Sequence, residues 1–296
     1  MQRSFDHIVV AARDLNALAE FWGHMGFRVG ARNQHPWGTR NHIVQFAGSF
    51  IELISIDTPY HAPVEPDPNV FSMAAFIHDH LKRREGAAMI SLTSADPRAD
   101  LDAFHAADLG RYVPFHFERR GKRADGSDTQ VAFTLAFARA RTMPHVGFFT
   151  CMQHYPENFW DARLQDHANG ACGLASLAIV ADDPADHAEF LSHFTDVRDF
   201  RSTSMGLSFR IGESGSQRID VYSPLAYAHR FGQQALGAWD GAPRIAAVEF
   251  VTSSMEATRT AFAGGRIPHA ERYDSLVVPP SASMGLALLV SPAPQA

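Results

Sequence analysis

One supersecondary pattern is written four times along this chain of 296 residues. Each copy begins with a short apolar stretch, passes a polar break that contains Asp or Ser, and continues into an amphipathic segment and further apolar stretches. The copies begin at Phe5, Ala87, Leu174 and Arg244. Repeated units determine the architecture, because a single unit cannot bury its apolar face without a neighbour.

The first copy is the clearest and predicts a strand followed by a helix. Residues 5–11 (FDHIVVA) are apolar and β-branched, as expected of a strand. Asp14 then stands at an N-cap position before the segment LNALAEFWGHMGF. The apolar residues of that segment share one helical face: Leu15, Leu18, Ala19, Trp22 and Met25.

Three further strands complete the first copy. Gly26 is expected to end the helix, and a second strand is expected to begin at residues 27–29. Residues 42–46 and 50–56 are separated by Ala-Gly-Ser, which favours a hairpin. The unit is therefore β-α-β-β-β. Outside it, the four prolines of residues 57–70 predict a loop, and a helix is expected next.

We therefore expect an α+β protein in which four β-α-β-β-β repeats form two modules, each with a curved mixed sheet around a cleft. The first module is expected to span residues 1–156 and the second residues 172–296. Residues 157–171 belong to no repeat and are expected to be the joint between the modules.

Three stretches of the first module resemble a known family. FDHIVVAARDL, HPWGTRNHIVQF and FIELISI are similar to the glyoxalase-like domain branch of the vicinal oxygen chelate superfamily. The segment FFTCMQHYPENFW, with LQDHANGA after it, is similar to a signature of that branch. The resemblance implies the paired-module fold. It does not select an activity, because the superfamily contains isomerases, lyases, epimerases, dioxygenases, resistance transferases and metal-free binding proteins.

The resemblance also implies a metal site. In the superfamily a divalent metal is typically held by His or Gln on the first strand of a unit and Glu on its last strand, which are the positions of His7 and Glu52. Imidazole and carboxylate suit Fe, Mn, Ni, Co or Zn. A carboxylate in an apolar strand must in any case be paired, metal-bound or protonated. The alternative is that Glu52 pairs with an Arg such as Arg40, while His7 is a core histidine.

The remaining metal ligands are less clear. Met89 stands opposite His7 in the second copy. The last strand of that copy, HVGFFTCMQH, has no Glu, and its polar candidates are Cys151, Gln153 and His154. Alternation puts His154 on the opposite face from the other two, and the sequence does not determine which face is inward. We choose His154, because with His7 and Glu52 it forms a two-His, one-carboxylate set that suits Fe(II).

The segment HPWGTRNH is expected beside the mouth of the first cleft, where it could orient a polar substrate. The predicted substrate-binding residues are His35, Trp37, Arg40, Asn41 and His42. The alternative is an ordinary turn. A basic cluster that includes His116, Arg119 and Arg120 could steer an anionic substrate, or could be a solvated hairpin tip.

The second module is predicted to lack the metal site. Ala175 stands at the position of His7, and neither Asp220 nor Glu249 has a His partner at the matching strand positions. We expect this module to have a structural or dimer-forming role, so that the protein could form a homodimer.

Composition restricts the partners. The formal charge of −6 and the pI near 6.2 argue against a nucleic-acid partner. No apolar run long enough for a membrane span is present, and no signal peptide is apparent. Two cysteines fit a reduced, cytoplasmic protein.

Two functions fit these observations. One is a metal-dependent lyase, isomerase or dioxygenase whose small oxygenated substrate chelates the metal, with His7 and Glu52 as catalytic residues. The other is a metal-free protein that binds or sequesters a small molecule on the same fold.

Overall fold

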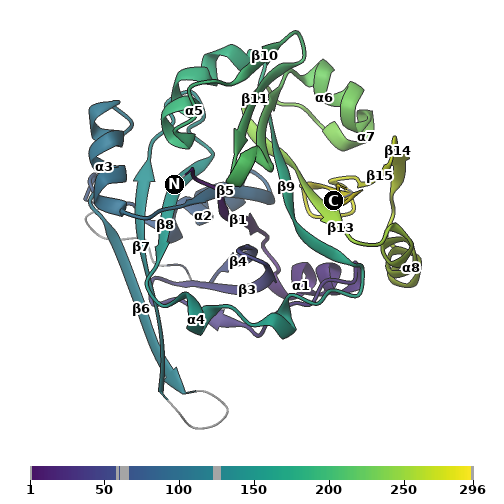
Figure 1. Ribbon diagram of the computed structural model, residues 1–296, viewed down its shortest axis with the longest axis horizontal. Helices are drawn as coiled ribbons and strands as arrows, with labels where there is room; N and C mark the ends of the chain where they lie inside the picture. The colour runs from purple at the N-terminus through teal and green to yellow at the C-terminus, as the bar shows by residue number, and fades with distance from the viewer. Residues whose placement is uncertain (1, 58–59, 61–66, 123–127, 295–296) are drawn as a thin grey trace.

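Four β-α-β-β-β units form two eight-stranded mixed sheets, as predicted (Figure 1). The computed structural model describes residues 2–57, 60, 67–122 and 128–294. Most of the loop predicted at residues 57–70 therefore lies outside the described residues. In the part of the chain that the structure describes, no helix is long and apolar enough to cross a bilayer.

The first sheet has the strand order β2-β3-β4-β1-β5-β8-β7-β6. Its strands are β1 (Phe5–Ala11), β2 (Asn33–Gln34), β3 (Thr39–Phe46), β4 (Ser49–Ile56), β5 (Gly86–Thr93), β6 (Phe115–Lys122), β7 (Asp128–Ala138) and β8 (Gly147–Gln153). β1 pairs with β4, and β5 with β8, in parallel, whereas β1 and β5 are antiparallel. The two units of the module therefore meet at the centre of the sheet.

The second sheet repeats this pattern with the order β10-β11-β12-β9-β13-β16-β15-β14. Its strands are β9 (Ala171–Val180), β10 (Arg201–Thr203), β11 (Gly206–Ile211), β12 (Gln217–Tyr222), β13 (Arg244–Thr252), β14 (Ala270–Arg272), β15 (Ser275–Val278) and β16 (Ala287–Pro292). Because β9 and β13 occupy the central places of β1 and β5, positions can be compared between the modules strand by strand.

The helices separate into two groups, because strand side chains alternate between the two faces of each sheet. Ile8 and Val10 pack in one core cluster, and Val9 and Ala11 pack in another on the opposite face. The helices α1 (Leu15–His24), α3 (Pro97–Ala106), α5 (Ala188–Thr195) and α8 (Met255–Gly265) pack on one face of each sheet, in the core cluster that contains residues of both modules. The helix α2 (Met73–Arg83) fills part of the concave face of the first sheet, and α6 (Pro224–Phe231) with α7 (Gln233–Leu236) does the same in the second.

The prediction of a strand at residues 27–29 is wrong, because β2 begins only at Asn33. Gly26 has φ +88° and does end the helix, but it turns Phe27 inward instead of into a strand. The Phe27 ring lies 5.0 Å from Trp22 and 5.2 Å from Phe250 of the second module. The two modules thus share one core, and a residue in that core is not free to pair at a sheet edge.

The predicted joint is held by hydrogen bonds to both modules. It contains most of α4 (Pro156–Phe159) and the 3-10 segment η1 (Ala162–Leu164). Two further 3-10 segments of the described chain, η2 (Pro184–His187) and η3 (Glu213–Gly215), lie in the second module. Asn169 Nδ2 donates to the Met25 carbonyl at 3.0 Å, and the Asn169 carbonyl accepts from Thr258 Oγ1 at 2.7 Å. His167 is buried and bonds the backbone of Arg28 and Gln45. The joint therefore fixes the two modules against each other.

Candidate functional site

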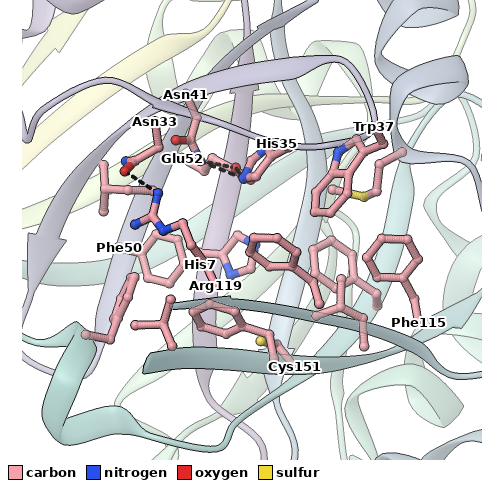
Figure 2. A pocket seen from close by; sticks show the side chains of 18 residues that line it. His7, Asn33, His35, Trp37, Asn41, Phe50, Glu52, Phe115, Arg119 and Cys151 are labelled. Atoms are coloured by element: carbon pink, nitrogen blue, oxygen red, sulfur yellow. Dashed lines mark hydrogen bonds and ion pairs between the residues drawn. The ribbon is translucent and has the colours of Figure 1, made fainter. Parts of the chain in front are cut away.

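A cavity of about 110 Å³ lies on the concave face of the first sheet (Figure 2). Its walls are mainly aromatic: Trp37, Phe50, Phe115, Phe117, Phe133, Phe149 and Phe159. A few polar side chains interrupt these walls, among them His7, His35, Asn41, Glu52 and Arg119. A concave apolar pocket with a few convergent polar groups is the usual form of a small-molecule site.

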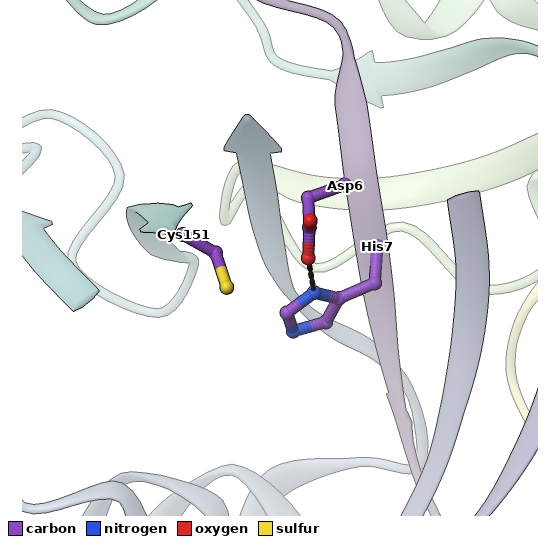
Figure 3. Close-up of side chains that lie close together, drawn as sticks. All are labelled: Asp6, His7 and Cys151. Atoms are coloured by element: carbon purple, nitrogen blue, oxygen red, sulfur yellow. Dashed lines mark hydrogen bonds and ion pairs between the residues drawn. The ribbon is translucent and has the colours of Figure 1, made fainter. Parts of the chain in front are cut away.

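His7 reaches the cavity from β1 with its orientation fixed by Asp6. The pairing of β1 with β5 shifts between Phe5 and His7, so Asp6 is the extra residue of a bulge and turns to the same side as His7. Asp6 Oδ1 lies 2.5 Å from His7 Nδ1 (Figure 3). On its other side, Asp6 Oδ2 accepts a hydrogen bond from Gln153 Nε2 at 2.9 Å. The His7 ring stacks on Phe50 with 4.3 Å between centroids.

Nδ1 of His7 is therefore occupied, whereas Nε2 has no hydrogen-bond partner among the described residues. The side chain lines the cavity while it is only 6% exposed. An imidazole with one nitrogen held by a carboxylate presents its other nitrogen for coordination or proton transfer.

Glu52 stands on β4 in a second polar group. Asn41 Nδ2 donates to Glu52 Oε1 at 2.5 Å, and His35 Nε2 lies 3.9 Å from the same oxygen. His35 Nδ1 is held by Thr39 Oγ1 at 2.7 Å, and the ring stacks on Trp37 at 4.5 Å. Burial lowers the pKa of His35 despite the nearby carboxylate of Glu52, so its imidazole is neutral at neutral pH.

Two polar atoms at this end of the cavity have no partner. Asn41 Oδ1 and Trp37 Nε1 are buried and form no hydrogen bond within the described residues. A buried acceptor or donor without a partner costs about 1–3 kcal/mol, which a bound group can recover. These atoms indicate that the cavity is built to receive a polar molecule.

Arg119 joins the two edges of the sheet above the cavity. It extends from β6, and its Nη1 donates to Asn33 Oδ1 on β2 at 2.7 Å. Because β2 and β6 are opposite edge strands, this bond joins the two edges of the curled sheet across its concave face (Figure 2). Arg119 is the one Arg or Lys among the described residues that line the cavity. The hairpin-tip interpretation of the basic cluster therefore does not apply to it.

Five of the predicted site residues line this cavity: His7, His35, Trp37, Asn41 and Glu52. The side chain of Arg40 lies on the other face of β3, because strand side chains alternate between faces. Its Nε lies 3.9 Å from Asp57 Oδ1, so Arg40 does not pair with Glu52. His42 also points away, with Nδ1 2.7 Å from the Gly30 carbonyl.

His154 is not brought to His7 and Glu52. It is exposed, and its Nε2 lies 2.7 Å from Thr134 Oγ1. The reason is the alternation of β8, in which Cys151 lines the cavity and Gln153 bonds Asp6, so that the next residue lies outside. The predicted His7, Glu52 and His154 set is therefore not assembled.

Sequence reasoning missed Asp6, Asn33 and Arg119 as members of one site with His7. Neighbouring residues of a strand normally point to opposite faces, so only the bulge reveals Asp6. Asn33 and Arg119 are far apart in the sequence and meet only because the sheet curls. No pattern in the sequence carries that information.

Comparison with known proteins agrees with this geometry. A family model described as a glyoxalase-like domain matches residues 5–195. The chain belongs to the glyoxalase-like domain family. The resemblance to this branch of the vicinal oxygen chelate superfamily is thereby confirmed.

Two solved structures show the same fold as this glyoxalase-like protein. A hypothetical protein from Staphylococcus aureus superposes with a TM-score of 0.69 at 11% identity, over 98% of this chain and 100% of its own. A triple mutant of 4-hydroxymandelate synthase from Streptomyces coelicolor superposes with a TM-score of 0.55 at 11% identity, over 100% and 94%. Identities this low establish the fold alone. No curated protein sequence matches the chain.

Strand register identifies the positions of the second unit that match His7 and Glu52. The number of residues between β1 and α1 equals the number between β5 and α3, so the two strands can be aligned at their last residues. In this alignment Met89 is the residue equivalent to His7. The register of β4 on β1 and of β8 on β5 then matches Phe149 to Glu52. Both matching side chains are apolar and buried. Any metal ligands in this glyoxalase-like cavity must therefore come largely from the first unit.

The same comparison corrects one position in the second module. The interval from the end of β9 to the helix cap Asp183 equals the interval from the end of β1 to the cap Asp14. The residue of the second module that is equivalent to His7 is therefore Ser176, and not Ala175. Asp220 pairs with β9 as Glu52 pairs with β1, so it stands at the position that matches Glu52.

The residues of the first cavity include donors of the kinds that bind divalent metals. His7 and His35 each have Nδ1 held by an oxygen, and both line the cavity with Glu52. Two imidazoles and one carboxylate form a donor set typical of non-haem iron and related metals. Among the described residues, the group whose potential ligand atoms all lie within 4.8 Å of one another is Asp6, His7 and Cys151, and the set of His7, His35 and Glu52 is not gathered that closely. Burial, with Asp6 nearby, raises the pKa of the Cys151 thiol well above its usual value, so the thiol form is favoured.

Proposed function

We propose that this protein is a metal-dependent enzyme of the glyoxalase and dioxygenase type, a lyase, isomerase or dioxygenase acting on a small oxygenated molecule. The reaction would take place in the first-module cavity, with His7 and Glu52 as catalytic residues. The observation that supports this best is the arrangement of His7 and His35, whose Nδ1 atoms are held while both rings line the cavity beside Glu52.

The proposed ligands are His7, His35 and Glu52, with His35 in place of the predicted His154. A divalent metal bound there would polarise neighbouring oxygen atoms of the substrate and could activate dioxygen. Asp6 fixes the tautomer and direction of His7, and Thr39 does the same for His35. Asn41 holds one carboxylate oxygen of Glu52, which limits its rotation.

The walls of the cavity define the proposed substrate. Seven aromatic rings favour a flat, apolar body and exclude water, which strengthens polar interactions inside. Arg119 would pair with an anionic oxygen of the substrate at the opening, since its guanidinium has one hydrogen bond, to Asn33, and no carboxylate partner among the described residues.

A metal-free binding protein is the second candidate. Met89 and Phe149, at the positions that match His7 and Glu52, favour it, because a metal would then have ligands on one side only. The aromatic cavity could hold the same class of ligand without any reaction. A homodimer and a cytoplasmic location stay predictions.

Metal content separates the two candidates. We expect near-stoichiometric Fe, Mn, Ni, Co or Zn by elemental mass spectrometry in purified wild-type protein, and its loss in Glu52→Ala, His7→Ala and His35→Ala. His154→Ala is the matched control, because it removes an exposed histidine of the same module that lies outside the cavity. A wild-type protein that is metal-free and takes up no added metal would sink the proposal. Metal retained in all three cavity variants would do the same.

A further inference from the structure

The second module has a cavity of its own, with chemistry unlike that of the first. It measures about 720 Å³ and lies along β10, β11 and β12. Four arginines line it: Arg201, Arg210, Arg218 and Arg230. Two acidic side chains, Asp199 and Asp220, also line it, so cations outnumber anions at this place on a chain whose net charge is −6.

Sheet register places three of these arginines on one face. Arg201 pairs with Ser208, and Ser208 pairs with Asp220, so these residues form one row across the strands. In the adjacent row, Arg210 stands directly opposite Arg218. Like charges directly opposite each other in an antiparallel pair destabilise a sheet unless a counter-charge lies between or beside them.

Among the described residues, only one of these arginines has a carboxylate as its counter-charge. Arg218 Nε lies 3.4 Å from Asp220 Oδ2, and its Nη2 lies 3.3 Å from Glu249 Oε2. Ser176 and Ser291 donate to the two oxygens of Glu249 at 2.6 and 2.7 Å. This buried network is complete, so Arg218 is held in place and has little charge left to offer.

The other three arginines have no carboxylate partner in the described part of the chain. Arg210 Nη1 donates only to the Gly215 carbonyl, at 3.4 Å. Arg230 from α6 lies over the ring of Tyr273 at 5.5 Å, which restrains it without neutralising it. Arg201 on the edge strand β10 has neither kind of contact, and its exposure leaves it free to move toward a bound anion.

We propose that this cavity binds a small multivalent oxyanion, a molecule that carries a phosphate group or several carboxylates. Planar guanidinium groups bind both groups through paired N–H donors, and several of them converging select for high charge. The position matching Phe50 in the first module is Arg218 here. The second module is therefore a second binding site with changed specificity, and this inference does not depend on a metal in the first cavity.

Calorimetric titration of the full chain tests the proposal, with inorganic phosphate, citrate and chloride at equal ionic strength. We expect saturable binding of phosphate or citrate, with no binding of chloride. Binding of phosphate alone identifies a phosphate-bearing ligand, and binding of citrate alone identifies a polycarboxylate. The double variant Arg201→Ala, Arg230→Ala should bind at least about 10-fold more weakly, as expected when charged hydrogen bonds are lost.

The matched control is Arg98→Ala, Arg111→Ala, which removes two exposed arginines of the first module. It should bind as the wild type does. Arg201→Glu provides a second variant, because it reverses one exposed charge and should also abolish binding while the circular dichroism spectrum stays unchanged. Failure of both phosphate and citrate to bind wild type would overturn the proposal, as would equal loss of binding in the control.

Discussion

Replacing Asp6 by Asn should weaken metal binding in the first cavity about 10- to 100-fold while the fold is retained. Removing a carboxylate that orients a ligating histidine typically has an effect of this size. In free energy it corresponds to about 1.4–2.7 kcal/mol. The carboxylate is only 2% exposed and lies 2.5 Å from His7 Nδ1, so solvent screens its effect little.

The structure explains why Asp6→Asn should still fold. Asn keeps an oxygen that accepts from His7 Nδ1, and its amide nitrogen then faces Gln153. Gln153 Oε1 is buried and has no hydrogen-bond partner among the described residues, so a rotation of that amide supplies an acceptor for the new donor. The variant loses the charge and keeps the hydrogen bonds, which makes it a test of electrostatics and not of packing.

The assay is a competition titration with a coloured chelator, accompanied by thermal unfolding in the presence of excess chelator. Asp108→Asn is the matched control, because Asp108 is exposed and already has the positive φ that Asn tolerates. We expect unchanged unfolding in both variants and weakened metal binding only in Asp6→Asn. Wild-type affinity in Asp6→Asn, together with lost binding in His7→Ala, would refute a role for Asp6 in directing His7.

Three further predictions concern other parts of the molecule. Burial lowers the pKa of His80 from 6.5 to about 4, so its stabilising contribution is present above pH 6.5 and is lost as the pH falls toward 4. This loss should be roughly 3 kcal/mol by denaturant unfolding, and His80→Leu should reduce the pH dependence. Arg218→Ala should lower the free energy of unfolding by about 2 kcal/mol, because the buried carboxylates of Asp220 and Glu249 lose their cation. The effect is limited because the Arg218 side chain is 34% exposed and solvent screens its charge. Arg119→Ala should weaken calorimetric binding of 4-hydroxybenzoate about 10-fold and leave binding of benzyl alcohol unchanged, whereas the adjacent exposed Arg120→Ala should affect neither.

The fold could be predicted because its signals are local. Asp14 caps α1 through the amides of Asn16 and Ala17, and Asp96 caps α3 in the same way. Ser254 caps α8, and the Ala-Gly-Ser segment connects β3 to β4. Each of these contacts joins residues a few positions apart, so the sequence pattern contains all that is needed to recognise them.

The site was predicted only in part, because its assembly depends on features that cross the sheet. The direction of His154 depends on which residue of β8 faces inward, and alternation alone gives two equal answers. The position of Asp6 depends on a bulge, and the bond between Arg119 and Asn33 depends on the curl of the whole sheet. His7 and Glu52 could be predicted because the family resemblance places them on particular strands, and His35 because the segment HPWGTRNH is expected beside the mouth of the cleft.

The two modules show two ways of accommodating a carboxylate at one buried sheet position. Asp220 has the guanidinium of Arg218 as a permanent cation, which also serves Glu249. Glu52 has the amide of Asn41 and a neutral His35 beside it, and among the described residues no Arg or Lys lies within ion-pair distance of it. A buried carboxylate without a cation is costly, and that cost favours a bound metal or a protonated ligand in the first module alone. We therefore expect one metal ion per chain, not two, and its complete loss in Glu52→Ala.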